Sequence, residues 1–526
     1  MQSGRAPRGG PVAGASARGV SRRRFLVRAE GPLIVALDVG TSSLRASLYD
    51  AQGRAIPGAR ASEGTPLCVT PDGGAEIDPG ELLRAVVRAV AALRERAAPL
   101  MGQVVGVGVS TFWHSLMATD AQGRPLSPIY TWADTRAAGA VGRLRRMVDE
   151  RAAHARTGCH FHASYWPAKV AWLRRSRADL RGRGVRWLSP ADYLFGQLFG
   201  SPFCSYSMAS ATGLFDQNRL EWDGVLLEVL GIDAGQLSPL VDRDVQVRGA
   251  RAPWRDALGP LADLPWFPAV GDGACNNVGA GCMGRERIGL MIGTSGAMRV
   301  LWEAERAEAP WGLWCYRLDR RHGLVGGAIS NGGNLYAWLV DSLRLEKGPA
   351  LERELAALEP DGHGLTFLPF LAGERNPGYA HGATATITGL RWHTRPIDIL
   401  RAGLEAVAYR LALIHELLAP YASPEAGIVA SGAALVSSPA WVQIIADVLG
   451  RPITAISEME ASSRGAALLA AQMLGLIESP ACIAPPPGVL CEPDPVRHAR
   501  YREGLARHRR LYRRLLGRRA VAREAV

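Results

Sequence analysis

The sequence predicts an α/β protein with two large domains, each built on a mixed sheet. Its 526 residues exceed the size at which a single hydrophobic core stops growing. Short apolar runs alternate with segments of helical spacing along most of the chain, which is typical of α/β domains. A strand–turn–strand pattern around Gly40-Thr41-Ser42 also recurs 253 positions later at Gly293-Thr294-Ser295, and this recurrence indicates an internal duplication.

The composition is that of an ordinary globular protein, with 48% hydrophobic and 21% charged residues. Most of the net charge of +12 comes from the two ends of the chain. Seven Arg and one Glu in residues 1–30, and eleven Arg and two Glu in residues 497–526, contribute +15 and leave residues 31–496 at about −3. A basic groove across the body is therefore not expected, and neither is a nucleic-acid partner.

Lysine is almost absent, with Lys169 and Lys347 against 59 arginines. No G-x-x-x-x-G-K-[ST] sequence occurs, so a bound nucleotide would be held by backbone amides and hydroxyl groups rather than by a P-loop. Lys169 is interpreted as an exposed lysine on a surface helix. The eight cysteines are scattered without a C-x-x-C pair, as expected of free thiols in the cytoplasm. No apolar run reaches the roughly 18 residues that a membrane span requires.

The two ends are expected to lie outside the folded domains. Residues 1–30 form a basic extension, interpreted as a disordered tail or an over-long translation start, with an export signal or a transit peptide as alternatives. Residues 31–275 are assigned to an N-terminal domain and residues 276–480 to a C-terminal domain. Residues 481–526 contain a proline-rich linker and a basic helix from Arg497 to Arg519.

The first domain is predicted to begin with a glycine turn that binds an anion. A buried-type strand from Leu33 to Leu37 runs into Asp38 and then into Gly40-Thr41-Ser42. Successive backbone N–H groups in such turns form concave anion-binding sites. A helix is predicted from Asp78 to Ala98, with Asp78 as its N-cap.

Polar side chains among aromatic residues follow the next strand. The strand from Val104 to Val109 leads to His114 near its carboxyl end, where ligands of open α/β sheets gather. Asp134 and Arg136 follow in another aromatic segment. Such a set suits a polyol or a sugar acid. Arg136 is the candidate for binding a carboxylate, because the guanidinium fork matches carboxylate geometry.

An isolated acid near the second glycine turn is the candidate catalytic residue. In GDGACNNVGAG, Asp272 lies between two glycines and opens a predicted helix that contains Asn276. The strand from Ile288 to Ile292 follows and runs directly into Gly293-Thr294-Ser295. An acid beside a phosphate-binding turn suits the transfer of a phosphoryl group to a hydroxyl, in which positioning and charge stabilisation do most of the catalysis.

In this order, the motifs resemble the FGGY family of carbohydrate kinases over residues 33–480. The resemblance rests on DVGTSSLRASLYD, TWADTRA, GDGACNNVGAG, IGTSGAMRV, LTFLPFLAGERNPG, SGAALVSSPAWVQIIADVLGRP and SSRGAALLA. It implies two actin-like, ribonuclease-H-like domains with mixed sheets flanked by helices, and an active site in the cleft between them. STFWHSLMATDAQGRPLSPIYTWADTRA and SYSMASATGLFD are most similar to the gluconokinases of the family.

The resemblance also implies roles for individual residues. Asp272 is expected as the general base, and Asp38 lies near Mg²⁺, which it would hold through water. Substrate contacts are expected from Trp113, His114, Asp134, Arg136, Asp272 and Asn276. ATP is expected at Asp38, Gly40, Thr41, Ser42, Arg45, Gly293, Thr294, Ser295, Gly432 and Ala433. Family members commonly have a second glycine where Ala433 stands, so this departure bears on nucleotide affinity.

The predicted reaction is the ATP-dependent phosphorylation of D-gluconate to 6-phosphogluconate with Mg²⁺, in which Asp272 accepts the hydroxyl proton. Kinases for xylulose, glycerol or a similar sugar or polyol are the alternatives within the class. A non-catalytic, actin-like nucleotide-binding regulator is the alternative outside it. The expected location is cytoplasmic, the expected partner is a small sugar acid or sugar and not a membrane, and a homodimer is one option.

Overall fold

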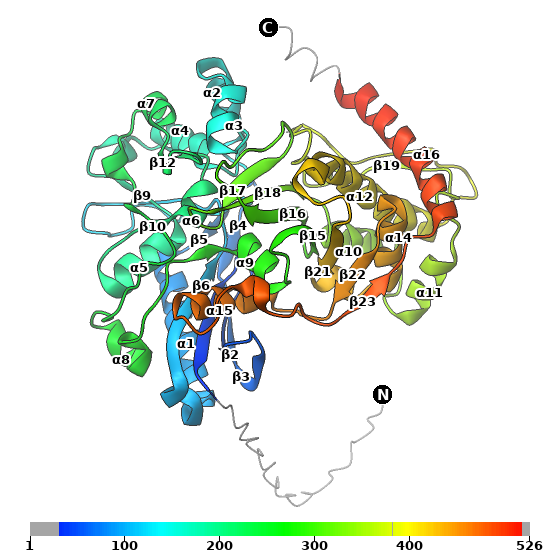
Figure 1. Ribbon diagram of the computed structural model, residues 1–526. Coiled ribbons are helices and arrows are strands. Elements are labelled where there is room, and N and C mark those ends of the chain that lie inside the picture. Colours follow the sequence, from blue (N-terminus) through cyan, green and yellow to red (C-terminus); the bar gives the residue numbers. More distant parts are fainter. Residues whose placement is uncertain (1–30, 381, 518–526) are drawn as a thin grey trace, which may run out of the picture.

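Two mixed sheets organise the protein, whose computed structural model describes residues 31–380 and 382–517 (Figure 1). The extension predicted at residues 1–30 lies outside these described residues. The first sheet has the order β14-β6-β1-β2-β3, with β1 (Leu33–Val39), β2 (Ser43–Asp50), β3 (Ala55–Gly64), β6 (Val104–Thr111) and β14 (Val270–Gly271). The second has the order β17-β18-β16-β15-β21-β22-β23, with β15 (Gly284–Ile292), β16 (Gly296–Glu303), β17 (Trp314–Arg317), β18 (His322–Ile329), β21 (Gly427–Ser431), β22 (Ile453–Ile456) and β23 (Gly488–Cys491).

The two sheets share one arrangement of strands. β1 pairs antiparallel with β2 and parallel with β6. In the same way, β15 pairs antiparallel with β16 and parallel with β21. Each G-T-S turn joins the first two strands of its own sheet, β1 to β2 or β15 to β16. The recurrence in the sequence therefore corresponds to a repeated sheet topology, and the predicted fold of two mixed α/β units is confirmed.

Helices pack on the two sheets through their apolar faces. α1 (Pro79–Arg96) packs on β2 and β3, and the Asp78 side chain accepts a hydrogen bond from the Glu81 N–H at 2.7 Å, as predicted for its N-cap. α12 (Pro396–Leu418) packs on β16 and β18 and is buried along most of its length. α10 (Gly333–Ser342) and α14 (Pro439–Leu449) pack against α12.

One helix from late in the chain belongs to the first sheet. α15 (Ala461–Met473) packs on β1, β6 and α9 (Asp272–Gly279), and it lies on the β6 side of the molecule in Figure 1. Gly465 of α15 lies so close to the Cys275 carbonyl that a β-carbon there would collide with it. Two predictions need correction. The boundary between residues 275 and 276 falls inside α9, and α15 packs with the N-terminal core because small residues let the two helices approach closely.

The chain between β6 and β14 builds a third apolar cluster beside the first sheet. This cluster includes residues of α2 (Ala138–Met147), α3 (Glu150–Thr157), α4 (Trp166–Ser176) and α7 (Gly224–Leu230). In the same stretch, α5 (Pro190–Phe199) and α6 (Tyr206–Ser210) pack with the core of the first sheet. At the other end, α16 (Pro495–Tyr512) contains most of the basic helix predicted from Arg497. All eight cysteines are free thiols. In residues 31–380 and 382–517, no helix combines the length and apolar character needed to cross a membrane.

Candidate active site

Asp272 is the first residue of α9, directly after the short strand β14. The indole of Trp113 packs so closely on Gly271 and Gly273 that a β-carbon at either position would collide with the ring. The ring is held in place because its Nε1–H donates to the Ser207 carbonyl at 3.1 Å. Trp113, which we predicted as a substrate contact, therefore also positions the backbone on both sides of Asp272.

Burial raises the pKa of the Asp272 carboxyl from its usual 3.8 to about 6. The positive charge of Arg299 opposes this shift, while the nearby carboxylate of Asp38 adds to it. The Gly273 N–H donates to Asp272 Oδ1 at 2.8 Å. The carboxylate is thus ionised at neutral pH but holds a proton far more readily than an exposed aspartate. Those are the properties of an effective general base.

Asp38 lies at the end of β1 with its side chain buried. The Ser110 hydroxyl donates to Oδ1 at 2.8 Å, and the Arg45 guanidinium donates to Oδ2 at 3.3 Å. Burial raises the pKa of the Asp38 carboxyl, against the effects of Ser110 and Arg45. Arg45 also pairs with Glu460 at 3.1 Å, just before α15. A carboxylate oxygen in this position suits Mg²⁺, which prefers oxygen ligands and commonly keeps several waters.

The two glycine turns lie at matching positions of the two sheets, and each exposes one hydroxyl residue to solvent. Ser42 of the first turn and Thr294 of the second are exposed. The second turn is braced by the start of α10, because the Gly333 N–H donates to the Gly293 carbonyl at 2.9 Å and the Asn334 N–H donates to the Thr294 carbonyl at 3.1 Å. Phosphate binding by these turns remains a prediction.

The predicted adenosine turn lies beside the second glycine turn. Met291 of β15 is paired in parallel register with Ser431 of β21, so both strands end at the same edge of the sheet. Gly432 follows Ser431 directly, and Ala433 is the exposed first residue of α13 (Ala433–Val436). Because its backbone is helical, the extra methyl group of Ala433 is accommodated without strain.

His114 forms part of an aromatic wall. Its φ of +64° is unusual for a residue with a side chain. Its Nδ1 lies 2.7 Å from the Ala211 carbonyl, and since a carbonyl only accepts, Nδ1 carries the proton and Nε2 remains an acceptor. The ring packs edge-on against Tyr165 and Tyr316. Burial, followed by the charge of Arg375, holds the pKa of His114 well below its usual value, so the imidazole is neutral.

Lys169 is buried, which corrects the prediction of an exposed surface lysine. Its ammonium group donates to the carbonyls of His114 at 3.0 Å, Thr131 at 2.8 Å and Ser164 at 2.8 Å. The chain at residues 114, 131 and 164 is thereby held together at one point. Burial lowers the pKa of Lys169 to about 7. This lysine fixes the unusual backbone of His114. The rarity of lysine in this arginine-rich chain was the one feature of the sequence that could have indicated such a role.

Asp134 and Arg136 are paired with each other. The Arg136 guanidinium donates to Asp134 Oδ2 at 2.5 Å and also pairs with Glu76. It lies over the rings of Tyr130 and Trp172 at 5.4 and 5.1 Å from their centroids. Two carboxylates therefore already neutralise Arg136, which argues against it as the residue that binds a substrate carboxylate. Asp134 is fully used as an acceptor by Arg136 and by the Ala75 N–H.

Two arginines near Asp272, the buried Arg299 and the half-buried Arg375, were not singled out from the sequence. Arg299 on β16 packs against Gly273, and its Nε and Nη1 have no hydrogen-bond partner among the described residues. Burial lowers its pKa to about 10. Arg375 lies in the loop between β19 (Thr366–Leu368) and β20 (Thr386–Thr388) and acts electrostatically on both Asp272 and His114. Asn276 is four residues after Asp272, so both side chains share one face of α9.

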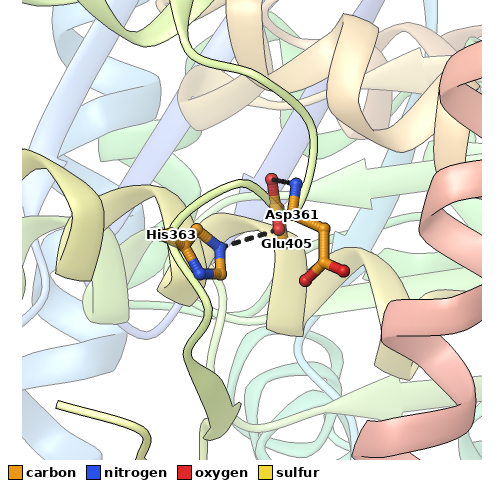
Figure 2. A group of neighbouring side chains, drawn as sticks. All are labelled: Asp361, His363 and Glu405. Carbon is orange, nitrogen blue, oxygen red and sulfur yellow. Dashed lines mark hydrogen bonds and ion pairs between the residues drawn. The ribbon is translucent and has the colours of Figure 1, made fainter.

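Asp361, His363 and Glu405 gather elsewhere, in the second domain (Figure 2). His363 Nδ1 accepts the Leu365 N–H at 2.9 Å, so Nε2 carries the proton and donates to Glu405 at 3.0 Å. Glu405 also accepts from Arg401 at 2.8 Å, and Arg507 pairs with Asp361. Both imidazole nitrogens and both carboxylates are thus engaged, which favours an ion-pair network that ties α12 to α16 over a metal site.

The chain matches two consecutive family domains. Residues 33–279 match the N-terminal domain of the FGGY family of carbohydrate kinases, and residues 290–474 match its C-terminal domain. The gluconokinase of Bacillus subtilis is 28% identical over 459 residues, which are 85% of this chain and 88% of that protein. The xylulose kinase of Escherichia coli is 27% identical over 496 residues, or 92% and 99% of the two chains.

The fold has matching relatives of known structure. The gluconate kinase of Lactobacillus acidophilus superimposes with a TM-score of 0.84 at 26% sequence identity, over 92% of this chain and 98% of that chain. The predicted two-domain, actin-like fold is therefore confirmed. Both family domains are matched in order, and together they cover most of the described residues. The protein belongs to the FGGY family of carbohydrate kinases.

Proposed function

We propose that this carbohydrate kinase phosphorylates D-gluconate at its terminal hydroxyl, giving 6-phosphogluconate and ADP. The observation that carries the proposal is the position of Asp272, a carboxylate of raised pKa at the start of α9 on which the positive charges of Arg299 and Arg375 act. The similarity to gluconokinases over most of the chain supports the choice of gluconate. A negatively charged substrate also suits a site with two arginines that form no ion pair with any described residue, Arg299 and Arg375.

Asp272 acts as the general base. It accepts the proton of the terminal hydroxyl while that oxygen forms its bond to the γ-phosphorus, and the bond between the γ-phosphorus and the bridging oxygen breaks to release ADP. Proton transfer of this kind typically contributes about 10²- to 10⁴-fold to the rate. The cation Arg299 beside α9 is placed to stabilise negative charge on the transferred group.

The nucleotide is held by the paired turns. Backbone N–H groups and hydroxyls of Thr41, Ser42, Thr294 and Ser295 bind phosphate oxygens, and the Gly432-Ala433 turn at the same edge of the second sheet lies along the adenosine. Asp38 would hold Mg²⁺, and the ion would supply neutralisation of the phosphate charge. Because one turn comes from each domain, ATP binding draws the two domains together and excludes water from the site.

A coupled ADP-release assay tests the proposal. The purified protein is given Mg-ATP with gluconate, xylulose, glycerol or no acceptor. We expect gluconate to have the highest kcat/KM and the acceptor-free rate to be low. A higher kcat/KM with xylulose or glycerol would overturn the choice of gluconate. ATP binding without acceptor-dependent ADP release would indicate a regulator and would overturn the proposed activity.

A further inference from the structure

We infer that Arg375 binds the carboxylate of the sugar acid, so that a residue of the second domain selects acidic substrates. This inference rests on the proposed gluconokinase function. Arg375 takes the role that the sequence suggested for Arg136, because Asp134 and Glu76 already neutralise the Arg136 guanidinium. The inference depends on three features of Arg375: a rigid loop, a guanidinium without a counter-charge and a position beside the aromatic wall at His114.

The residues on both sides of Arg375 are firmly anchored. Glu374 is buried and pairs with Arg410, and it accepts a hydrogen bond from the Tyr512 hydroxyl of α16 at 2.7 Å. Asn376 is also buried and accepts the Ala328 N–H of β18 at 2.8 Å. The backbone of Arg375 is thus fixed by helices and a central strand, which is how a site residue is held in a productive geometry.

The guanidinium of Arg375 has no counter-charge. No carboxylate of the described residues forms an ion pair with it, and its buried Nε has no hydrogen-bond partner among them. Its neighbours are the hydroxyl groups of Tyr165, Tyr316 and Tyr379, and Tyr165 accepts a hydrogen bond from it. Arg375 is half-buried, and removing a cation from water without a counter-charge is costly. A ligand that brings a carboxylate would satisfy it with charge-assisted, bidentate hydrogen bonds.

The two arginines without an ion pair contact different parts of the site, Arg299 at Gly273 and Arg375 at the Tyr165 hydroxyl. Arg299 packs on Gly273 at the start of α9, close to the base. Arg375 instead is the charge that acts most strongly on His114, next to the tyrosine pair Tyr165 and Tyr316, whose hydroxyls are 2.6 Å apart. A chain-like substrate with its reacting hydroxyl at Asp272 and its body along the His114 wall would present its far end to Arg375. In gluconate that end is the carboxylate.

The test compares gluconate with D-glucitol, which has the same carbon chain but a hydroxymethyl group in place of the carboxylate. Arg375→Gln is expected to lower kcat/KM for gluconate by about 10²- to 10³-fold and for glucitol by less than about fivefold, because only gluconate loses its ionic partner. Arg375→Lys keeps the charge without the fork and is expected to lose about tenfold on gluconate. Arg353→Gln, an exposed arginine on α11 (Pro349–Ala357), is the matched control and should change neither value.

Rescue provides a second readout that does not require turnover of glucitol. Addition of guanidinium ion at tens of millimolar should restore gluconate phosphorylation to Arg375→Ala but not to Asp272→Asn. Thermal unfolding and ADP binding check that each variant is folded. Should Arg375→Gln fail to fold, Arg375→Lys replaces it, and a larger loss on gluconate than on glucitol supports the inference.

Failure of the inference and failure of the proposed function give different results. Equal losses on both substrates in the Arg375 variants, or no loss on gluconate, would overturn the role of Arg375 while the wild-type protein still phosphorylates gluconate. A wild-type protein that phosphorylates only neutral acceptors would overturn the proposed function itself.

Discussion

Replacing Asp272 with asparagine has two expected effects, one on turnover and one on the stability of the folded protein. Asparagine cannot accept the hydroxyl proton, so we expect turnover with gluconate to fall by about 10²- to 10⁴-fold. The turns at Gly40 and Gly293 are unchanged in the variant, so ATP binding should be kept. Near-normal turnover would refute the assignment of Asp272 as the base.

The same substitution should stabilise the protein at neutral and alkaline pH. Burial raises the pKa of Asp272 from 3.8 to about 6, and each pKa unit corresponds to about 1.4 kcal/mol. The ionised carboxylate therefore costs the folded state up to about 3 kcal/mol above pH 6. The folded state holds the proton more tightly than the unfolded state, so this cost is absent below about pH 4, grows as the pH rises from there to the folded pKa of about 6, and is constant above it. Asparagine is neutral throughout and avoids it.

Thermal unfolding at about pH 5 and about pH 8 measures this effect. A gain of about 1 to 3 kcal/mol should raise the Tm at about pH 8 by several degrees, given roughly 2–4 °C per kcal/mol for a domain of this size. The gain should be smaller at about pH 5. Asp256→Asn, on the exposed surface of α8 (Trp254–Leu258), is the matched control. Equal or lower stability of Asp272→Asn at the higher pH would refute the account of a half-buried, unfavourable charge.

Three further predictions follow from the site. In the wild-type protein, kcat/KM for gluconate should fall below about pH 6 as Asp272 is protonated, and a profile that stays flat down to about pH 5 would contradict the base assignment. Arg136→Gln should destabilise the protein by about 3–5 kcal/mol in denaturant unfolding, because Asp134 is left unpaired. The ratio of kcat/KM for gluconate to kcat/KM for glucitol should stay the same. A changed ratio would indicate that Arg136 binds the substrate carboxylate. Lys169→Met should lower kcat/KM and stability together, because three buried carbonyls lose their donor and His114 its support, so normal kinetics would contradict this positioning role.

Local patterns were enough to predict the framework of the fold. The two G-T-S turns each lie between a buried strand and an alternating strand, and this pattern is set by neighbouring residues. The structure places both turns in sheets of the same topology. The start of α1 at Asp78 was visible for the same reason, since an N-cap is a contact between residues close in sequence.

Features that depend on distant partners were not predictable. α15 packs on α9, almost two hundred residues earlier, and so belongs to the N-terminal core. The local sequence of α15 does not indicate which helix it contacts. Arg136 appeared available because Glu76, 60 positions away, was not recognised as its partner. Arg375 was one of 59 arginines, and only the packing around it shows that its charge is unpaired.

The position of the new phosphate tests the central claim most directly. The wild-type protein is incubated with Mg-ATP and gluconate labelled with ¹³C, and the product is examined by ³¹P and ¹³C NMR. The account predicts one phosphate ester on the terminal carbon, formed in equal amount with ADP, and no product with Asp272→Asn on the same timescale. A phosphate on another carbon, or no product from gluconate while xylulose or glycerol is phosphorylated, would contradict it.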